Sequence, residues 1–185
     1  YMGDPDGDRI DESDNTAGNN DDVIQAGAGD DTIKSHYGND SVDAGDGNDS
    51  VWGGAGDDTI EGGADADTVV FGGDKGDFTF ALATDGTLTV TDTNTNTALG
   101  VDTVSGVETL RFDDGDLTVT TAAGGEVTLT GSDVADDITV VGSVAATLEG
   151  TGGNDAITGG SGADDIVGGA GDDTLEGGAG DDTIE

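Results

Sequence analysis

The sequence predicts an all-β protein, and two features of the chain lead to this prediction. A nine-residue repeat occupies two separate blocks, and each copy alternates turn-forming residues with a short strand. Between the blocks, apolar and polar residues alternate, and Asp-Gly pairs interrupt the alternation. We therefore expect two repetitive β-structures on either side of a small, antiparallel β-module.

The repeat is clearest in residues 53–61, with the sequence Gly-Gly-Ala-Gly-Asp-Asp-Thr-Ile-Glu. In steps of nine it extends back to Ala17 and forward to Val70, which makes six repeats in one register. The same register returns from Gly150 to Glu185 with four more repeats. The eighth position always holds Ile, Val or Leu, and the sixth always holds aspartate, namely Asp22, Asp31, Asp40, Asp49, Asp58, Asp67, Asp155, Asp164, Asp173 and Asp182.

Each repeat has a turn and a strand. The fourth position is glycine except at Asn20 and Asp65, and these residue types enter left-handed backbone conformations at least cost. We expect six turn residues followed by a three-residue strand, in which only the central aliphatic side chain faces inward. One buried side chain in each repeat cannot offset the entropy lost when so many glycines are ordered. A further stabilising element is therefore expected.

A hard cation would supply this stabilisation, because Ca²⁺ takes six to eight oxygen ligands from carboxylates and backbone carbonyls. The pattern G-G-x-G-x-D-x-U-x, with U an aliphatic residue, resembles the RTX family of calcium-binding nonapeptide repeats. The resemblance implies two parallel β-rolls, in which two repeats make one turn of the roll. Turns on one side would then stack at every second repeat, with an ion between them.

The resemblance also implies a ligand set. Aspartates two repeats apart would share an ion, which gives about six complete sites and half-sites at the block ends, in the pairs Asp22–Asp40, Asp31–Asp49, Asp40–Asp58, Asp49–Asp67, Asp155–Asp173 and Asp164–Asp182. Carbonyl groups at glycine positions are expected to complete the sites, namely those of Gly27, Gly29, Gly45, Gly47, Gly54, Gly56, Gly160, Gly162, Gly169 and Gly171.

The charge of the chain limits its partners. With 42 acidic and four basic residues, the formal net charge is −38, and 36 glycines with an apolar fraction of 32% place the metal-free chain near the disordered class. We expect folding to be coupled to calcium binding, with dissociation constants of roughly 10⁻⁴ to 10⁻³ M. The charge argues against nucleic acid as a partner, and no membrane insertion is expected. Disulfides are excluded, because there is no cysteine.

We expect five segments along the chain: residues 1–16 as an acidic linker or decayed calcium-binding repeat, 17–70 as the first roll, 71–130 as a β-rich capping or spacer module, 131–149 as degenerate, metal-free transition repeats, and 150–185 as the second roll. In the first segment, Asp8 and Ile10 fit the sixth and eighth positions of a repeat. Whether residues 4–15 bind calcium is left open.

The middle module is expected to form antiparallel hairpins, with strands near residues 78–82, 88–90, 101–104, 107–112, 117–121 and 127–130. Its expected role is to cap the open end of the first roll, as terminal units of repeat arrays do. In the transition repeats, Asp136 and Ile138 keep the sixth and eighth positions, whereas Ala146 replaces the aspartate. His36 stands in a glycine position and is expected in an exposed turn.

The leading hypothesis is a calcium-binding region that folds outside the cell and serves the secretion and folding of a larger bacterial exoprotein. The resemblance implies the type I secretion apparatus as a partner of that protein.

A structural extender segment of a large adhesin or surface-layer protein is one alternative, with a cell-surface or matrix target left open. A non-catalytic tail of a secreted hydrolase or lyase is another, because no catalytic constellation is evident in these residues. The chain stops on the ninth position of a complete repeat, so we expect it to be part of a longer protein.

Overall fold

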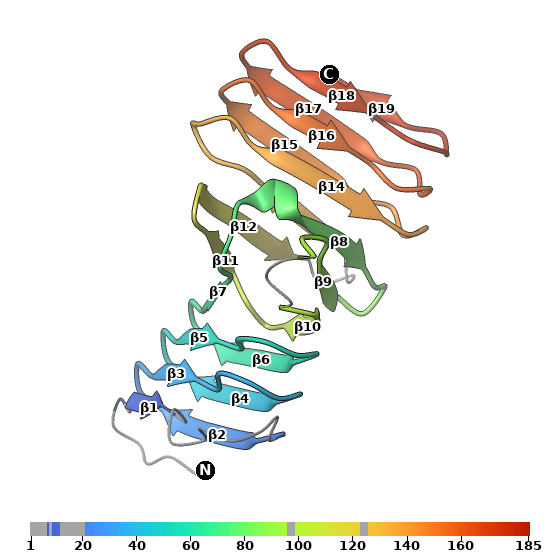
Figure 1. Ribbon diagram of the computed structural model, residues 1–185. Helices are drawn as coiled ribbons and strands as arrows, with labels where there is room; N and C mark the ends of the chain where they lie inside the picture. Colours follow the sequence, from blue (N-terminus) through green and yellow to red (C-terminus); the bar gives the residue numbers. More distant parts are fainter. Residues whose placement is uncertain (1–6, 8, 12–20, 96–98, 123–125) are drawn as a thin grey trace.

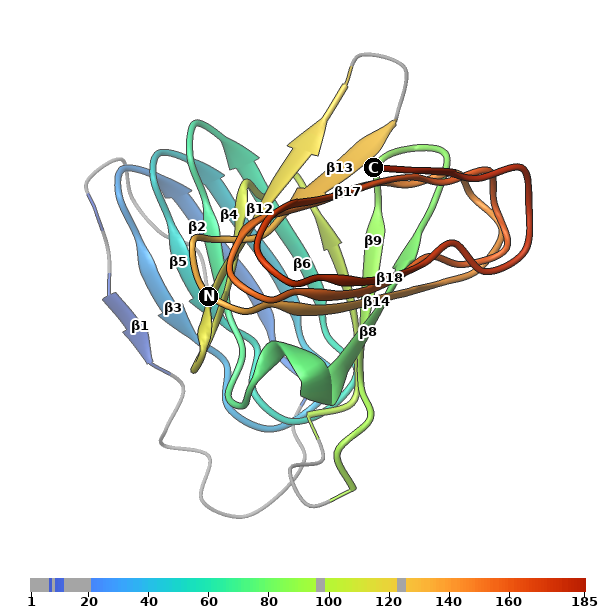
Figure 2. The same cartoon turned by 90° about the horizontal axis from the view of Figure 1, so that it is seen from above.

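The computed structural model describes residues 7, 9–11, 21–95, 99–122 and 126–185. These residues form a 10-stranded sheet and a 9-stranded sheet, together with one short 3₁₀-helix, η1 (Lys75–Asp77). The strands stack in layers from the N-terminal array, through the middle segment, to the C-terminal array (Figure 1). Seen from above, the loops of the second array run in a different direction from those of the first (Figure 2).

The 10-stranded sheet contains, in spatial order, β1 (Arg9–Asp11), β3 (Thr32–Lys34), β5 (Ser50–Trp52), β7 (Thr68–Val70), β11 (Thr109–Phe112), β12 (Gly115–Thr121), β13 (Val127–Thr130), β15 (Thr147–Gly152), β17 (Asp165–Ala170) and β19 (Thr183–Ile184). The 9-stranded sheet contains β18 (Thr174–Glu176), β16 (Ala156–Thr158), β14 (Asp137–Val141), β8 (Phe78–Leu82), β9 (Leu88–Asp92), β10 (Val101–Ser105), β6 (Thr59–Ala64), β4 (Ser41–Asp46) and β2 (Val23–Ala28).

In both arrays consecutive repeats place their strands in opposite sheets. The parallel partner of each strand therefore lies two repeats away, as in the register pairs Ile24↔Val42 and Ile33↔Val51. The second array follows the same rule, with Ile157↔Leu175. Two repeats thus make one turn, which confirms the expected all-β fold of parallel β-rolls.

Strand length differs from the expectation. The strands of the first array have three residues in one sheet, but β2, β4 and β6 in the other sheet have six. These longer strands continue into the first three positions of the next repeat, where Gly27 pairs in register with Gly45. Gly27 and Gly45 have φ values of 114° and 111°, which glycine adopts without steric cost, so the ladder can extend into the turn at these positions.

The aliphatic residues of the eighth position form the core between the sheets. Ile24, Ile33, Val42, Val51, Ile60 and Val69 are each at most 2% exposed. Ala26 and Ala44, from the first position of their repeats, are also fully buried. Ile184, in β19 at the edge of the sheet, is 47% exposed.

Both sheets continue through the described residues of the middle segment. Strand β10 pairs in parallel with β6, then β9 and β8 follow as antiparallel partners, and β8 pairs in parallel with β14. In the other sheet, β11, β12 and β13 connect β7 to β15 in the same way. Antiparallel hairpins were expected here, and in the structure they pair with the edge strands of both arrays.

The N-terminal segment continues the 10-stranded sheet. Strand β1 pairs in parallel with β3, and Ile10, 3% exposed, lies in register with Ile33. The segment therefore adds one strand, with the buried side chain of Ile10, to the sheet. Asp8 and most of residues 4–15 lie outside the described residues. None of the described segments forms a helix with the length and apolar character that crossing a membrane requires.

Candidate metal centre

The sixth-position aspartates lie at the start of each strand, where the turn enters the sheet. Seven of them are at most 2% exposed: Asp31, Asp40, Asp49, Asp58, Asp67, Asp155 and Asp164. Asp22, Asp173 and Asp182, at the ends of their stacks, are half-buried. The interior of the arrays therefore holds carboxylates as well as aliphatic side chains.

Hydrogen bonds link each aspartate to the one two repeats earlier. In every case Oδ1 of the later aspartate accepts the backbone N–H of the earlier one, as between Asp22 and Asp40 at 2.8 Å. The other linked pairs are Asp31–Asp49, Asp40–Asp58, Asp49–Asp67, Asp155–Asp173 and Asp164–Asp182, at 2.7–3.0 Å. The structure thus brings together all six pairs that the sequence suggested, in stacked turns.

The second carboxylate oxygen of these residues is oriented differently. Oδ2 is buried and accepts no hydrogen bond from the described residues in Asp40, Asp49, Asp58, Asp67, Asp155 and Asp164. A buried acceptor without a partner is costly, and a buried negative charge is more so. A cation next to each Oδ2 would remove this cost.

Glycine positions leave room beside the carboxylates and bring carbonyl groups close. A Cβ on Gly62, the first residue of its repeat, would lie 2.8 Å from Oδ2 of Asp67. A Cβ on Gly45 (φ +111°) would collide with the carbonyl oxygen of Gly27 in the turn below. The stacked turns therefore form a cradle of carboxylate and carbonyl oxygens that side chains at these positions would fill.

The oxygens in this cradle suit calcium. Within the described residues, no three Asp, Glu or His side chains converge on one point. An ion here would therefore take many of its ligands from the backbone, which Ca²⁺ accepts and softer metals do not. The glycine positions named from the sequence lie in these turns, and Gly27, Gly29, Gly45, Gly47, Gly54, Gly56, Gly169 and Gly171 have positive φ.

The sixth-position aspartates that hydrogen bonds link at every second repeat form rows along the arrays. Burial alters the acidity of these row aspartates. It raises the pKa of Asp58 and of Asp67 to about 6, although a backbone hydrogen bond to each carboxylate partly opposes this effect. The same cause raises the pKa of Asp40, Asp49 and Asp155. Without a cation these carboxylates are therefore less stable in their charged form than ordinary surface aspartates.

Two acidic residues of the middle segment extend the rows of the first array. Asp102, 4% exposed, accepts the N–H of Asp58 through Oδ1 at 2.9 Å. Glu108 accepts the N–H of Asp67 through Oε2 at 2.9 Å. Burial raises the pKa of Asp102 to about 8, and the carboxylates of Asp58 and Asp57 add to this shift. The rows of the first array therefore continue beyond Asp58 and Asp67, and neither residue is left as an open half-site.

The nine-residue period cannot reveal Asp102 and Glu108, because they lie 44 and 41 residues after their partners. A local signal does exist. Asp102-Thr103-Val104 and Glu108-Thr109-Leu110 copy the acidic, threonine and aliphatic residues at positions six to eight of the repeat. In the second array the rows begin at Asp136 and Ala146, whose N–H groups donate to Oδ1 of Asp155 and Asp164 at 2.9 and 2.8 Å.

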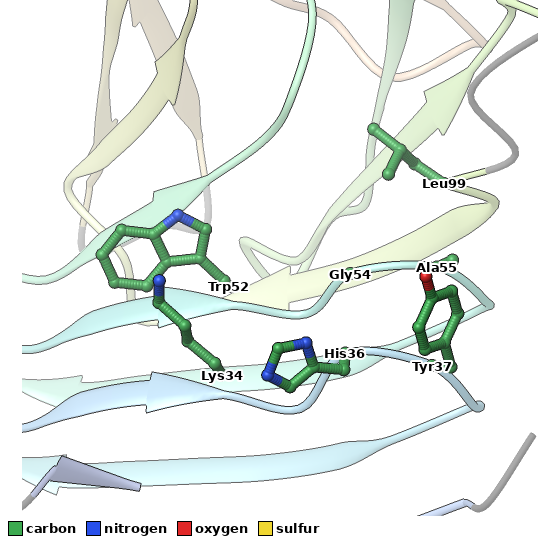
Figure 3. A pocket seen from close by; sticks show the side chains of 7 residues that line it. All are labelled: Lys34, His36, Tyr37, Trp52, Gly54, Ala55 and Leu99. Carbon is green, nitrogen blue, oxygen red and sulfur yellow. The ribbon is translucent and has the colours of Figure 1, made fainter. Parts of the chain in front are cut away.

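A separate cavity of about 380 Å³ lies on the first array, and none of the row aspartates lines it. Figure 3 shows its lining side chains, Lys34, His36, Tyr37, Trp52 and Leu99, together with Gly54 and Ala55. His36 adopts a φ of 73° and is half-buried, so the expectation of an exposed turn was wrong for this side chain. The Lys34 ammonium lies 4.7 Å from the centroid of the Trp52 ring, a cation–π contact.

The comparison with protein families agrees with this geometry. A family model for the RTX calcium-binding nonapeptide repeat matches residues 16–51, 43–76 and 149–184, just over half of the chain. No curated protein matches the sequence. Among solved structures, the crystal structure of extracellular lipase LipA from Serratia marcescens is similar, with a TM-score of 0.49 and 23% identity over 95% of this chain. The chain spans 30% of the length of that lipase chain.

Proposed function

The chain belongs to the RTX family of calcium-binding nonapeptide repeats, and from this premise we propose that it folds when it binds calcium outside the cell, as one region of a larger secreted protein. Calcium binding is the property of the repeats themselves. Coupling that binding to folding gives the region its role in secretion, because the chain is loose where calcium is scarce and ordered where it is abundant.

The observation that carries this proposal is the set of buried Oδ2 atoms in the rows. Asp49 is a representative case, because it is 1% exposed, its Oδ1 accepts the N–H of Asp31 at 2.7 Å, and its Oδ2 has no hydrogen-bond partner among the described residues. A folded chain without cations must bury several such charges, on top of a net charge of −38. Bound Ca²⁺ removes both penalties, so binding and folding are expected to occur together.

We propose as ligands the aspartates of the six stacked pairs, with backbone carbonyls of the glycine turns. To these we add Asp102 and Glu108, which stand above Asp58 and Asp67 as the paired aspartates stand above one another elsewhere. This addition makes the first array's rows continuous with the middle segment. Calcium bound at Asp102 and Glu108 would join the first array to the middle segment, just as calcium within the array would join one turn to the next.

The family and the charge together support export in an unfolded form. An acidic, glycine-rich chain without calcium repels itself and stays extended, which suits passage through a type I secretion apparatus. The proposed location is the outside of a bacterial cell, in the medium or at the surface. The activity of the whole secreted protein would lie in other parts of it.

The test is far-ultraviolet circular dichroism of this chain during a calcium titration, with magnesium as the control ion. We expect a cooperative gain of β-signal near millimolar calcium, reversed by chelator, with no comparable gain in magnesium, because Mg²⁺ demands a stricter geometry and gives up its water reluctantly. A β-rich spectrum that chelator leaves unchanged would show that the turns fold without metal, and the proposal would be lost.

A second function, as a structural extender, is favoured by the continuity of the two sheets. Both sheets run through the described residues of the middle segment, so paired strands join the two arrays in one stack. An extender must have this property, because a linker would bend under load. Small-angle scattering should then give an elongated rigid particle in calcium, and a particle with two independently moving halves would argue against this role.

A further inference from the structure

Lys75 is fully buried at the joint between the middle segment and the second array. It begins η1, directly before β8, and its side chain is 0% exposed. Its Nζ lies 2.9 Å from Oδ1 of Asp136 and 3.3 Å from Oδ1 of Asp114. Its backbone N–H also donates to Oδ1 of Asp114 at 2.9 Å. With only four basic residues in the chain, the complete burial of one of them calls for a specific role.

Asp136 is the first carboxylate of a calcium row. Asp136 directly precedes β14, which pairs with β16. The N–H of Asp136 donates to Oδ1 of Asp155, whose own N–H donates to Oδ1 of Asp173. Asp136 therefore holds the same position in its turn as the other row aspartates do in theirs. On its other side, β14 pairs with β8, the strand that follows Lys75.

Asp136 differs from the other buried row aspartates in the partners of its two oxygens. In Asp40, Asp49 and Asp155, Oδ2 has no hydrogen-bond partner among the described residues. In Asp136, Oδ2 accepts the backbone N–H of Ser132 at 2.6 Å, and Oδ1 lies against the Lys75 ammonium. At this turn the protein itself supplies the positive charge.

The backbone near Lys75 is shaped to hold its ammonium group. A Cβ on Gly115 would lie 2.9 Å from the Lys75 Nζ, so glycine at this position leaves the space that the ammonium needs. Gly115 also adopts a φ of +137°, which other residue types rarely do. The carboxylates of Asp114 and Asp136 and the absent side chain of Gly115 together form the binding pocket of one internal cation.

A cluster of aromatic side chains lies close to Lys75 in sequence. Phe71 and Phe78, on either side of it in sequence, pack with their ring centroids 5.5 Å apart. Phe112 stacks on Phe71 at 5.4 Å and lies 5.1 Å from Phe78. Such a cluster stabilises a fold without metal, in contrast to the arrays, whose interior is shared between small aliphatic residues and aspartates.

We propose that the Lys75 ammonium supplies the positive charge at the base of the Asp136–Asp155–Asp173 row, at the Oδ1 atom that in the other row aspartates accepts a backbone N–H. The N–H of Ser132 occupies Oδ2, so this joint folds without calcium and provides the surface on which the second array assembles. This inference rests on the proposed calcium sites of the rows. It adds that the base of this row takes no calcium ion, and that the order of folding starts at β8 and β14. Strands β16 and β18 then follow as calcium fills the turns above.

Hydrogen–deuterium exchange of the full chain, with and without calcium, tests the proposal. In calcium-free buffer we expect β8 and β14 of the wild-type chain to exchange at least about tenfold more slowly than β4 in the first array. Lys75→Met should abolish this protection, with exchange in β14 faster by roughly a hundredfold, because it leaves two carboxylates without their cation. Protection of β14, independent of calcium in the wild type, should become dependent on calcium in the variant.

Two further variants make the result specific. Lys34→Met also removes one lysine charge, but from the cavity of the first array, and should leave β8 and β14 unchanged. If Lys75→Met fails to fold even in calcium, the double variant Lys75→Met/Asp136→Asn decides, since removing the unpaired carboxylate should restore at least about tenfold of the lost protection. A double variant no better than the single one would overturn the proposal.

The outcomes also separate this inference from the function it rests on. Strong protection of β4 in calcium-free buffer would refute the calcium-dependent folding of the arrays. If protection of β4 from exchange requires calcium, and protection of β14 in the wild type requires it equally, the proposed function stands and the role of Lys75 is refuted. Unchanged protection of β14 in Lys75→Met would refute that role as well.

Discussion

The backbone N–H of Asp58 donates a hydrogen bond to Oδ1 of Asp102, 44 residues further along the chain, at 2.9 Å. Within the arrays the equivalent bond always spans 18 residues, as from Asp40 to Asp58. The middle segment thus presents an aspartate where the next repeat would have presented one. A row that the sequence ends at Asp58 therefore continues for one more step in space.

Removing the charge of Asp102 should weaken calcium-induced folding of the first array. Asp102→Asn keeps an oxygen acceptor for the Asp58 N–H but removes one anionic ligand, so we expect the calcium midpoint to rise about tenfold. The measurement is a calcium titration followed by circular dichroism. Asp43→Asn, at an exposed ninth position, is the matched control. Equal midpoints for the two variants would show that Asp102 is not a ligand.

Asp40 should matter more than Asp22. Asp40 belongs to two stacked pairs, since its Oδ1 accepts the Asp22 N–H and its own N–H donates to Asp58. Asp22 belongs to one pair and is half-buried. We expect Asp40→Ala to raise the calcium midpoint about tenfold more than Asp22→Ala does. Coincident titration curves for the two variants would rule out shared sites.

A methyl group on Gly45 should destabilise the calcium-bound fold. Gly45 has a φ of +111°, and a Cβ there would collide with the carbonyl oxygen of Gly27. We expect Gly45→Ala to lower the free energy of unfolding in saturating calcium by ~2 kcal/mol or more, measured by urea denaturation. Gly72→Ala is the control, because a Cβ on Gly72 would meet no atom within 4 Å. A loss as large in the control would contradict the steric explanation.

The metal-free chain should become more structured as the pH falls. Burial raises the pKa of Asp58 and Asp67 to about 6 and that of Asp102 to about 8 in the folded state, against an ordinary value of 3.8. The folded state therefore binds more protons than the unfolded state between these values, and its stability is lost as the pH rises from about 4 to about 8. Circular dichroism in calcium-free buffers across this range measures the effect.

With calcium present, folding should favour ionised carboxylates over protonated ones, because Ca²⁺ binds the ionised form. The calcium midpoint should therefore rise as the pH falls below about 6, where Ca²⁺ and protons compete for Asp58 and Asp67. A metal-free chain that gains β-structure with increasing pH would contradict both expectations, since the raised pKa values would then not belong to the folded state.

The nine-residue period by itself determined which residues form the rows. A strict repeat gives every copy an aspartate at the sixth position and an aliphatic residue at the eighth. That these residues meet at every second repeat, as Asp31 meets Asp49 and Ile33 meets Val51, was implied by the resemblance to the RTX family. The parallel arrangement of the strands was likewise implied by that resemblance. The repeat also indicated calcium, because the oxygen ligands that this ion prefers, carboxylates and the carbonyls of glycine turns, are supplied by the repeats themselves.

Only the tertiary structure decided what happens where the repeat stops. Asp102 and Glu108 meet the first array, and Lys75 meets Asp136, across separations that no period sets. These contacts depend on how the antiparallel strands of the middle segment enter both sheets, which is a property of strand pairing over the whole segment. Local sequence specifies a turn and its nearest stacked neighbours, whereas the position of a buried charge at a joint depends on every element that packs around it.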